Sequence, residues 1–355
     1  RARLGVSEQS IVVEAVTAYM DYYRDKEILA LNNSNEAVLT RQLDATTQRF
    51  EAGEITSTNV HQSRARLDQS VADRIKSERN LEISRSSFLT VIGYLPESVT
   101  MPSLPLGLPN SRDTAMENAL KNNYGVIAAD FDTQAATSDI RKQKGVLLPS
   151  VDLEWSASRK LQGSSETSRV DDYGVLLVLS VPIYQKGLEY SKLRSVRQTA
   201  AEQHRTATQA RRNASKEALD AWETLRSAQA RNNSFRGQIK ATKMALEGVR
   251  EEADVGTRSI LDVLDAEQEF LNSKINLAQV QRDEIVASYE LLAAIGSPLI
   301  ERLGVSSDIY NPVGHTDEVE DKRFGGISSG DVTAEMLDEG KAYNLSTHPL
   351  PLPKK

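Results

Sequence analysis

The sequence predicts a mainly α-helical protein built from two copies of one unit, in which long helices pair as antiparallel coiled coils. Aromatic residues make up only 5% of the 355 residues and charged residues 26%, which is typical of long solvent-facing helices rather than of a thick globular core. A short break that contains glycine occurs twice, at Gly53 and at Gly256. The offset of 203 residues between them (256 − 53) stays in register over about eighty residues, which indicates an internal repeat.

The repeat aligns residues of the same type on both sides of each glycine. In each copy we predict a helix that runs into a glycine tip and a second helix that runs back to an Ile-Gly stop. Glycine lets the backbone reverse at the tip, and Ser259 followed three residues later by Asp262 is a capping-box pattern at a helix start. Aligned pairs include Glu14 with Glu217, Tyr19 with Trp222, Asn59 with Asp262, and Gly93 with Gly296.

The first copy, residues 1–93, is predicted to be a helical hairpin. Its first helix covers about 7–51 without proline, and its second covers about 57–92 with a seven-residue apolar step that Arg74 interrupts. The residues of this step are Val60, Leu67, Leu81 and Phe88. At the same offset, the counterpart of the β-hairpin described below would precede residue 1, so we expect the chain to be truncated at its N-terminus.

Residues 94–111 contain four prolines and are predicted to connect the copies, because proline is excluded from helix interiors and central strands. The second copy, 112–303, begins with a helix predicted from Asp113 to Lys144. Residues 304–355 are rich in glycine, serine, proline and acidic residues, and we expect them to form a flexible tail.

A β-hairpin is predicted at about 148–184. Apolar and polar residues alternate in its first strand, and both strands are about ten residues long, which is enough to span a membrane. Trp155, Tyr173 and Tyr184 are the candidate aromatic residues at the membrane interface. The pattern fits the edge of a soluble β-hairpin equally well. An isolated two-stranded hairpin is marginally stable in water, so we expect partner strands from other chains.

The second helical hairpin is predicted over 188–296. Its first helix, Leu188 to Glu252, would be about 98 Å long, too long for any core to enclose. Its second helix restarts at Ser259 and has two neighbouring apolar stripes, which indicate packing on two sides, as in a bundle or closed ring. The stripes are Leu264, Leu271, Ala278, Ile285 and Leu292, and Val263, Phe270, Leu277 and Leu291.

Composition excludes several functional classes. A net charge of −7 without a basic stripe argues against a nucleic-acid partner. The chain has no cysteine, its four histidines lack ligand spacing, and no nucleophile elbow, phosphate loop or zinc motif occurs. We therefore expect no enzyme, no catalytic residue, no metal and no cofactor. No apolar run approaches eighteen residues, so no transmembrane helix is expected.

Several segments resemble the TolC-like outer-membrane efflux proteins, the exit ducts of bacterial drug-efflux and type I secretion systems. They are Ala52-Gly53 with Thr58-Asn59-Val60, the second tip from Val255 to Asp265, Leu148-Pro149-Ser150, and Val181-Pro182-Ile183-Tyr184-Gln185-Lys186-Gly187. The resemblance covers about residues 7–300. It implies a homotrimer whose hairpins close one β-barrel in the outer-membrane lipid and whose helices form an α-barrel across the periplasm. It also implies a periplasmic adaptor (membrane fusion) protein as partner and, indirectly, an inner-membrane pump.

The resemblance also implies two acidic positions at the pore entrance. Asp262 and Asp265 match acids that ring the periplasmic end of the tunnel, and three chains would place six carboxylates there. Such a ring attracts cations and repels anions. Asp262 fits a helix N-terminal cap equally well, whereas Asp265 lies one turn further along the helix, where capping does not explain it.

Arg258 matches a residue that latches the family's entrance shut. The usual partner acid is replaced by Asn59 here, which leaves open whether Arg258 bonds Asn59 or Thr58, pairs with Glu54, or faces solvent. The tips match the surface that abuts the adaptor, although plain hairpin turns remain an alternative. The tip residues are Gly53, Glu54, Val255, Gly256 and Thr257.

Two functional hypotheses follow. The first is a passive trimeric exit duct in the outer membrane, extending into the periplasm, that serves a tripartite efflux or type I secretion system. The alternative is a soluble coiled-coil interaction or adaptor-like protein without channel activity. Only the duct would require detergent for extraction. Neither hypothesis selects between drugs and proteins as cargo.

Overall fold

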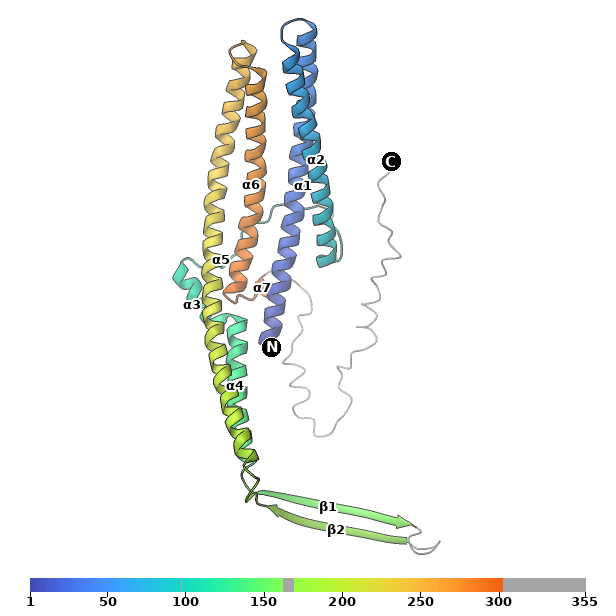
Figure 1. Cartoon of the computed structure of the whole chain (residues 1–355), viewed down its shortest axis with the longest axis vertical. Helices are drawn as coiled ribbons and strands as arrows, with labels where there is room; N and C mark the ends of the chain where they lie inside the picture. The colour runs from blue at the N-terminus through green and yellow to red at the C-terminus, as the bar shows by residue number, and fades with distance from the viewer. Residues whose placement is uncertain (97, 162–168, 303–355) are drawn as a thin grey trace. The chain divides into compact units, whose positions relative to one another are not determined.

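The computed structural model describes residues 1–96, 98–161 and 169–302, and its helices and strands belong to one compact unit, Ala2–Leu303. The protein is mainly α-helical, as predicted (Figure 1). The tail predicted at 304–355 lies outside the described residues. No helix in the described part of the chain is long and apolar enough to cross a membrane. The elements are α1 (Ala2–Glu51), α2 (Ser57–Ile92), α3 (Arg112–Asn122), α4 (Tyr124–Gly145), β1 (Ser150–Leu161), β2 (Arg169–Ser180), α5 (Leu188–Asp254), α6 (Ile260–Ala294) and α7 (Leu299–Arg302).

The long helices form two hairpins: α1 packs along α2, and α5 packs along α6 (Figure 1). The two tips are built alike. Gly53 has φ +78° and Gly256 has φ +81°, a left-handed conformation that glycine adopts without strain. In each tip the residue after the glycine donates its amide to a carbonyl of the last helical turn at 2.9 Å, which closes the helix end. The pairs are Glu54 with Arg49, and Thr257 with Glu252.

The contact between α1 and α2 follows a stripe of serines rather than the predicted apolar step. Leu67 and Leu81 of that step are only half-buried, although Phe88 is buried. Serine side chains are small, so the two helices can approach closely, and buried hydroxyls find partners across the contact. The Asn32 amide, for example, donates to Ser77 Oγ at 2.5 Å. The buried serines are Ser63, Ser70, Ser77 and Ser84.

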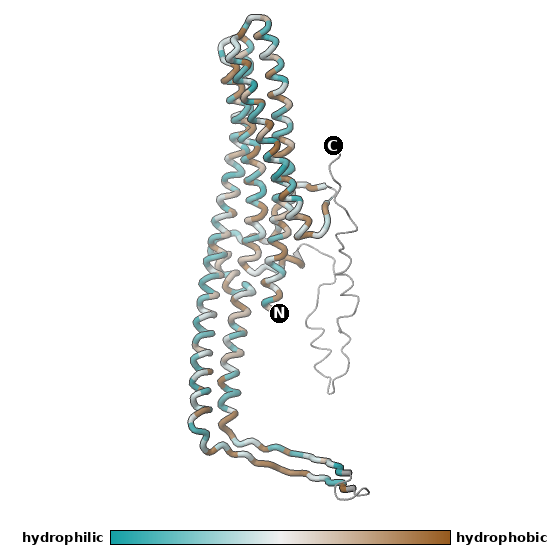
Figure 2. The backbone as a smooth tube through the Cα atoms, turned by 45° about the vertical axis from the view of Figure 1, so that its right-hand side comes forward, coloured by the Kyte–Doolittle hydropathy of each residue, from teal (hydrophilic) through white to brown (hydrophobic). Residues whose placement is uncertain are grey.

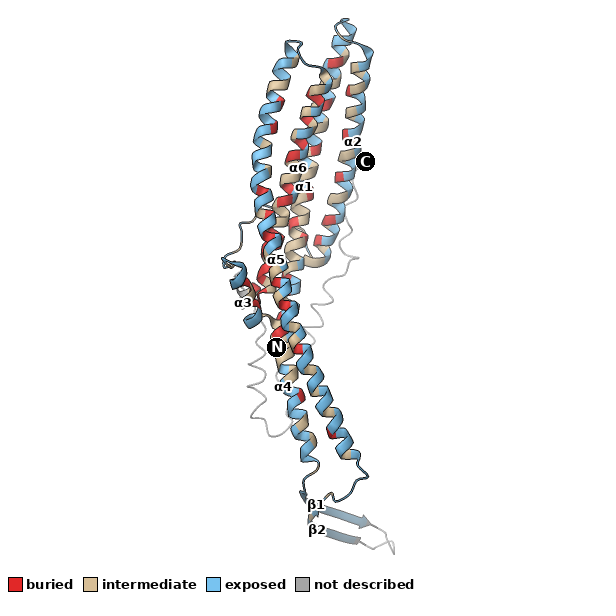
Figure 3. Ribbon diagram, turned by 60° about the vertical axis from the view of Figure 1, so that its left-hand side comes forward, coloured by how far each residue is buried: buried red, intermediate tan, exposed pale blue. Residues whose placement is uncertain are grey.

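Helix α6 packs against both α5 and α1, as its two apolar stripes predicted. The stripe from Leu264 to Leu292 is buried along its whole length, and Figure 3 shows buried residues along the helix. The second stripe is mixed, with Val263 and Leu291 buried and the other two residues half-buried. Near its C-terminal end α6 joins a hydrophobic cluster with α1, α3, α5 and α7. The buried members are Val12, Ala115, Ala119, Ala218, Leu225, Ala287, Leu291, Leu292, Ile295 and Leu299.

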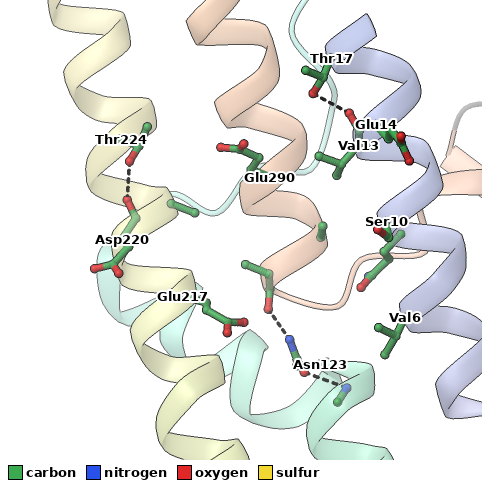
Figure 4. A pocket seen from close by; sticks show the side chains of 15 residues that line it. Val6, Ser10, Val13, Glu14, Thr17, Asn123, Glu217, Asp220, Thr224 and Glu290 are labelled. Atoms are coloured by element: carbon green, nitrogen blue, oxygen red, sulfur yellow. Dashed lines mark hydrogen bonds between the residues drawn. The ribbon is translucent and has the colours of Figure 1, made fainter. Parts of the chain in front are cut away.

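The helix predicted from Asp113 to Lys144 is broken into α3 and α4 at Asn123. Asn123 has φ −61° and ψ 123°, outside the helical region, and its side chain accepts hydrogen bonds from the amides of Gly125 and Val126. Its side-chain Nδ2 donates to the carbonyl of Ala294 at 3.0 Å (Figure 4). The end of α6 thus stabilises a break that local helix periodicity does not reveal.

Candidate functional site

The strands β1 and β2 pair antiparallel and place their largest apolar residues on one face. The two side chains of a pair in an antiparallel ladder point to the same face of the sheet, and successive pairs alternate between the two faces. The apolar face consists of Val151 with Leu179, Leu153 with Leu177, Trp155 with Val175, and Ala157 with Tyr173. All of these residues are exposed, and Figure 2 shows the hydrophobic character of much of β2. Within the described residues this face is therefore an uncovered apolar surface.

The apolar band ends where a charged pair begins. Arg159 Nε donates to Asp171 Oδ1 at 2.7 Å, directly beyond the pair of Ser158 and Asp172. From Val151 to Ala157 the band covers seven residues, or about 24 Å along the strand. Tyr173 lies at the end of this band next to the charged pair, with Trp155 two positions further in. Tyr184 follows β2 at the opposite end and is 83% exposed. Their placement at a membrane interface stays a prediction.

At the second tip, Asp262 is engaged in the capping box that starts α6. Asp262 Oδ2 accepts from the Ser259 amide at 3.0 Å and from Ser259 Oγ at 2.8 Å, while Ser259 Oγ accepts from the Asp262 amide. These hydrogen bonds from Ser259, followed by the charge of Arg258, lower the pKa of Asp262. The carboxylate therefore acts as a helix cap in this chain, one of the two roles that the sequence left open.

We predict that the cap makes the start of α6 sensitive to acid. Because the pKa of Asp262 is lowered in the folded chain, its stabilising effect is complete above the usual value of 3.8 and is lost as the pH falls through the folded value. Ser259→Ala should raise the pKa of Asp262 and speed amide exchange in the first turn of α6 about fivefold at neutral pH. Carboxyl titration and hydrogen exchange by NMR measure both effects.

The repeat supplies the control for this prediction. Thr56 is the N-cap of α2 at the aligned position, but its side chain makes no capping hydrogen bond. Thr56→Ala should leave exchange in the first turn of α2 nearly unchanged. Equal effects of the two substitutions would contradict a special role for the capping box.

Arg258 pairs within its own hairpin. Its Nε donates to Glu252 Oε2 at 2.8 Å, which raises the pKa of Arg258. Within the described residues, no hydrogen bond joins Arg258 to Asn59 or Thr58, and Glu54 pairs with Arg49 at 3.1 Å instead. In each tip an ion pair thus links the last turns of the first helix to the turn that follows the glycine. The proposed latch between Arg258 and the first hairpin stays a prediction for the assembled protein.

The residues expected to contact an adaptor are accessible. Gly53, Glu54, Gly256 and Thr257 are exposed, and Val255 is 75% exposed. A Cβ atom added to either glycine would meet nothing within 4 Å. The surface around both tips is therefore accessible. Glycine is favoured at these two positions by their positive φ and not by lack of space for a side chain.

Asp265 pairs with an arginine that sequence reasoning missed. The Arg66 guanidinium on α2 donates to Asp265 Oδ1 on α6, so this ion pair joins the first hairpin to the second. Both side chains remain partly exposed, at 37% and 56%. No local periodicity indicates such a contact, because it joins residues 199 positions apart on two different helical hairpins.

A cavity of about 880 Å³ lies between α1, α5, α6 and the start of α4 (Figure 4). Its lining includes four acidic residues, Glu14, Glu217, Asp220 and Glu290. Glu14 and Glu217 are aligned by the repeat, so both copies present the same residue type to one space. No group of histidine, cysteine, aspartate and glutamate residues in the described ranges is arranged to hold a metal ion. We assign no ligand to this cavity.

Comparison with known proteins identifies the family. The model of the family described as outer membrane efflux protein matches residues 115–297. The outer membrane efflux protein BepC of Brucella suis is 32% identical over 328 residues, which cover 92% of this chain and 72% of BepC. The outer membrane protein TolC of Escherichia coli is 24% identical, over 82% of this chain and 62% of TolC.

A solved structure shows the same fold. The outer membrane protein VceC from Vibrio cholerae superposes with a TM-score of 0.70 at 19% identity, covering 83% of this chain and 72% of VceC. The matches confirm the predicted family and, with it, an outer-membrane location and a channel-forming class of protein rather than an enzyme. With more than half of its residues matched by the family model, the chain belongs to the outer membrane efflux protein family.

Proposed function

We propose that the chain is a subunit of a passive trimeric exit duct that crosses the outer membrane and reaches into the periplasm. The apolar face of β1 and β2 is the observation that carries this proposal. From Val151 to Ala157 this face carries apolar or aromatic residues on both strands, whereas the opposite face pairs Asp152 with Val178 and Glu154 with Leu176. A barrel strand in a membrane has this alternation, with the apolar face toward lipid and the mixed face toward a water-filled lumen.

The unpaired edges of the hairpin support closure by other copies. β1 and β2 form a two-stranded sheet, so within the described residues each strand has one edge without a neighbour. Unpaired backbone groups are too costly inside lipid, and only a closed barrel satisfies all of them. Hairpins from three chains would supply partner strands for both of these edges.

The helices would continue the barrel toward the periplasm. Residues 1–93 form the first helical hairpin in this proposal, 94–111 the connector and 112–303 the second copy, with 304–355 as a tail. The exposed glycine tips would contact a periplasmic adaptor protein, through which an inner-membrane pump would energise export. Asp262 and Asp265 would lie near the entrance to the duct.

Cell fractionation tests the duct against the soluble coiled-coil alternative. We expect the protein in the outer-membrane fraction, released by detergent but not by salt, and trimeric by light scattering in detergent. The physical reason is the apolar face, whose side chains are left exposed by the described part of the chain. A monomer in the soluble periplasmic or cytoplasmic fraction would instead support the adaptor-like alternative.

A further inference from the structure

One ion pair near the tips joins the two helical hairpins. Arg66 on α2 donates to Asp265 on α6. The other ion pairs described in this part of the chain stay within one hairpin, among them Arg49 with Glu54, Arg64 with Asp68, Arg250 with Glu267, and Arg258 with Glu252. The next ion pair between the hairpins, Arg282 with Asp21, lies farther from the tips, on α6 and α1. Near the tips, the ion pair described between the hairpins is thus that of Arg66 with Asp265.

The pair changes the charge expected at the entrance. Six free carboxylates would line a trimeric entrance if Asp262 and Asp265 were both unpaired. In this chain the carboxylate of Asp262 accepts hydrogen bonds from Ser259, and the charge of Asp265 is balanced by Arg66. Because both partners of the pair are partly exposed, the charge of each can still attract or repel ions that pass within a Debye length, about 8 to 10 Å. The two charges then act on such ions with opposite sign.

We propose that Arg66 is a specificity-determining residue of the entrance. While the two hairpins lie together, Arg66 neutralises Asp265 and holds the cation preference low. When the hairpins separate, the pair breaks and the carboxylate of Asp265 is released to the pore. The inference rests on the proposed duct and adds to it a coupling between opening and ion selectivity.

Reversal potentials in planar bilayers test the role of Arg66. We expect Arg66→Gln to raise the ratio of potassium to chloride permeability about threefold, since three positive charges leave the entrance. Asp265→Asn should lower the ratio by a similar factor, because it leaves Arg66 unopposed. The double variant should return close to wild type.

Arg64→Gln is the matched control. Arg64 lies on the same helix, is 64% exposed and pairs with Asp68 of α2 at 3.3 Å, and among the described residues no ion pair joins it to the second hairpin. We expect its permeability ratio to stay within about a factor of 1.5 of wild type. An Arg66→Gln ratio no higher than that of Arg64→Gln would overturn the proposal.

A cross-linking experiment examines the contact without relying on conduction. The chain contains no cysteine, so Arg66→Cys with Asp265→Cys introduces the sole pair of thiols. A short bis-maleimide should join them within one subunit in high yield, and should join Arg64→Cys with Asp265→Cys poorly. Failure of the first cross-link would overturn the contact. If the double-cysteine variant cross-links efficiently but the wild-type protein conducts no current, the contact would stand. The duct, and the role of Arg66 with it, would then be rejected.

Discussion

Leu177→Arg is expected to abolish stable insertion of the protein into the outer membrane. Leu177 is 68% exposed, lies in the middle of the apolar face and pairs with Leu153. An arginine on the lipid face of a barrel costs about 2–4 kcal/mol near the bilayer midplane, and a trimer would incur this cost three times. Most of the protein should then leave the outer-membrane fraction, which quantitative immunoblots of fractionated cells would measure.

Leu176→Arg is the control because the neighbouring side chain lies on the opposite face. Leu176 is 59% exposed and pairs with Glu154, so an arginine there would face the lumen beside a carboxylate. We expect this variant to insert at near wild-type levels. If both variants inserted equally well, or failed equally, the assignment of the two faces would be wrong.

Gly296→Ala is expected to cause the largest loss of folding stability among the glycine substitutions. Gly296 has φ +74°, and a Cβ atom there would lie 2.1 Å from the carbonyl oxygen of Asn122 and 2.3 Å from its carbon. The backbone at the junction of α3 and α4 would have to move, which would disturb the hydrogen bond from Asn123 to Ala294. Strain and displacement together should cost about 2–4 kcal/mol.

Urea unfolding followed by circular dichroism measures this loss. Gly248→Ala in α5 is the matched control, since an added Cβ atom would meet nothing within 4 Å and the glycine is helical. Alanine should stabilise that position by about 0.5–1 kcal/mol. A Gly296→Ala protein as stable as wild type would show that the junction adapts freely.

Local signals made most of the fold predictable. The two neighbouring apolar stripes that begin at Val263 and Leu264 indicated a helix packed on two sides, and α6 is packed in this way. Glycine at 53 and 256 indicated chain reversal, and both residues have positive φ. The break at Asn123 was not predicted, although part of its cause is local, because Asn123 caps α4 through the amides of Gly125 and Val126. Its other hydrogen bond, from Nδ2 to the carbonyl of Ala294, joins residues 171 positions apart and has no local signal.

The candidate site was less predictable than the fold. Ser259 and Asp262 are three residues apart, so their capping box could be recognised from the sequence alone. The partner of Arg258 was not, because several acceptors lie within reach of a tip and the side chain bonds Glu252 rather than Asn59, Thr58 or Glu54. The pore-entrance and adaptor roles of these residues stay predictions.

The sequence by itself determined the mainly helical class and the two glycine tips, because periodicity and turn residues act over a few neighbouring positions. The family followed from the resemblance of the segments at the tips and beside the β-hairpin. Only the tertiary structure decided which charged groups meet. Arg66 and Asp265 lie 199 residues apart on different helical hairpins, and their contact depends on how α2 lies against α6. Ion pairs between exposed side chains are weak, so the chain carries no strong local pattern that would reveal them.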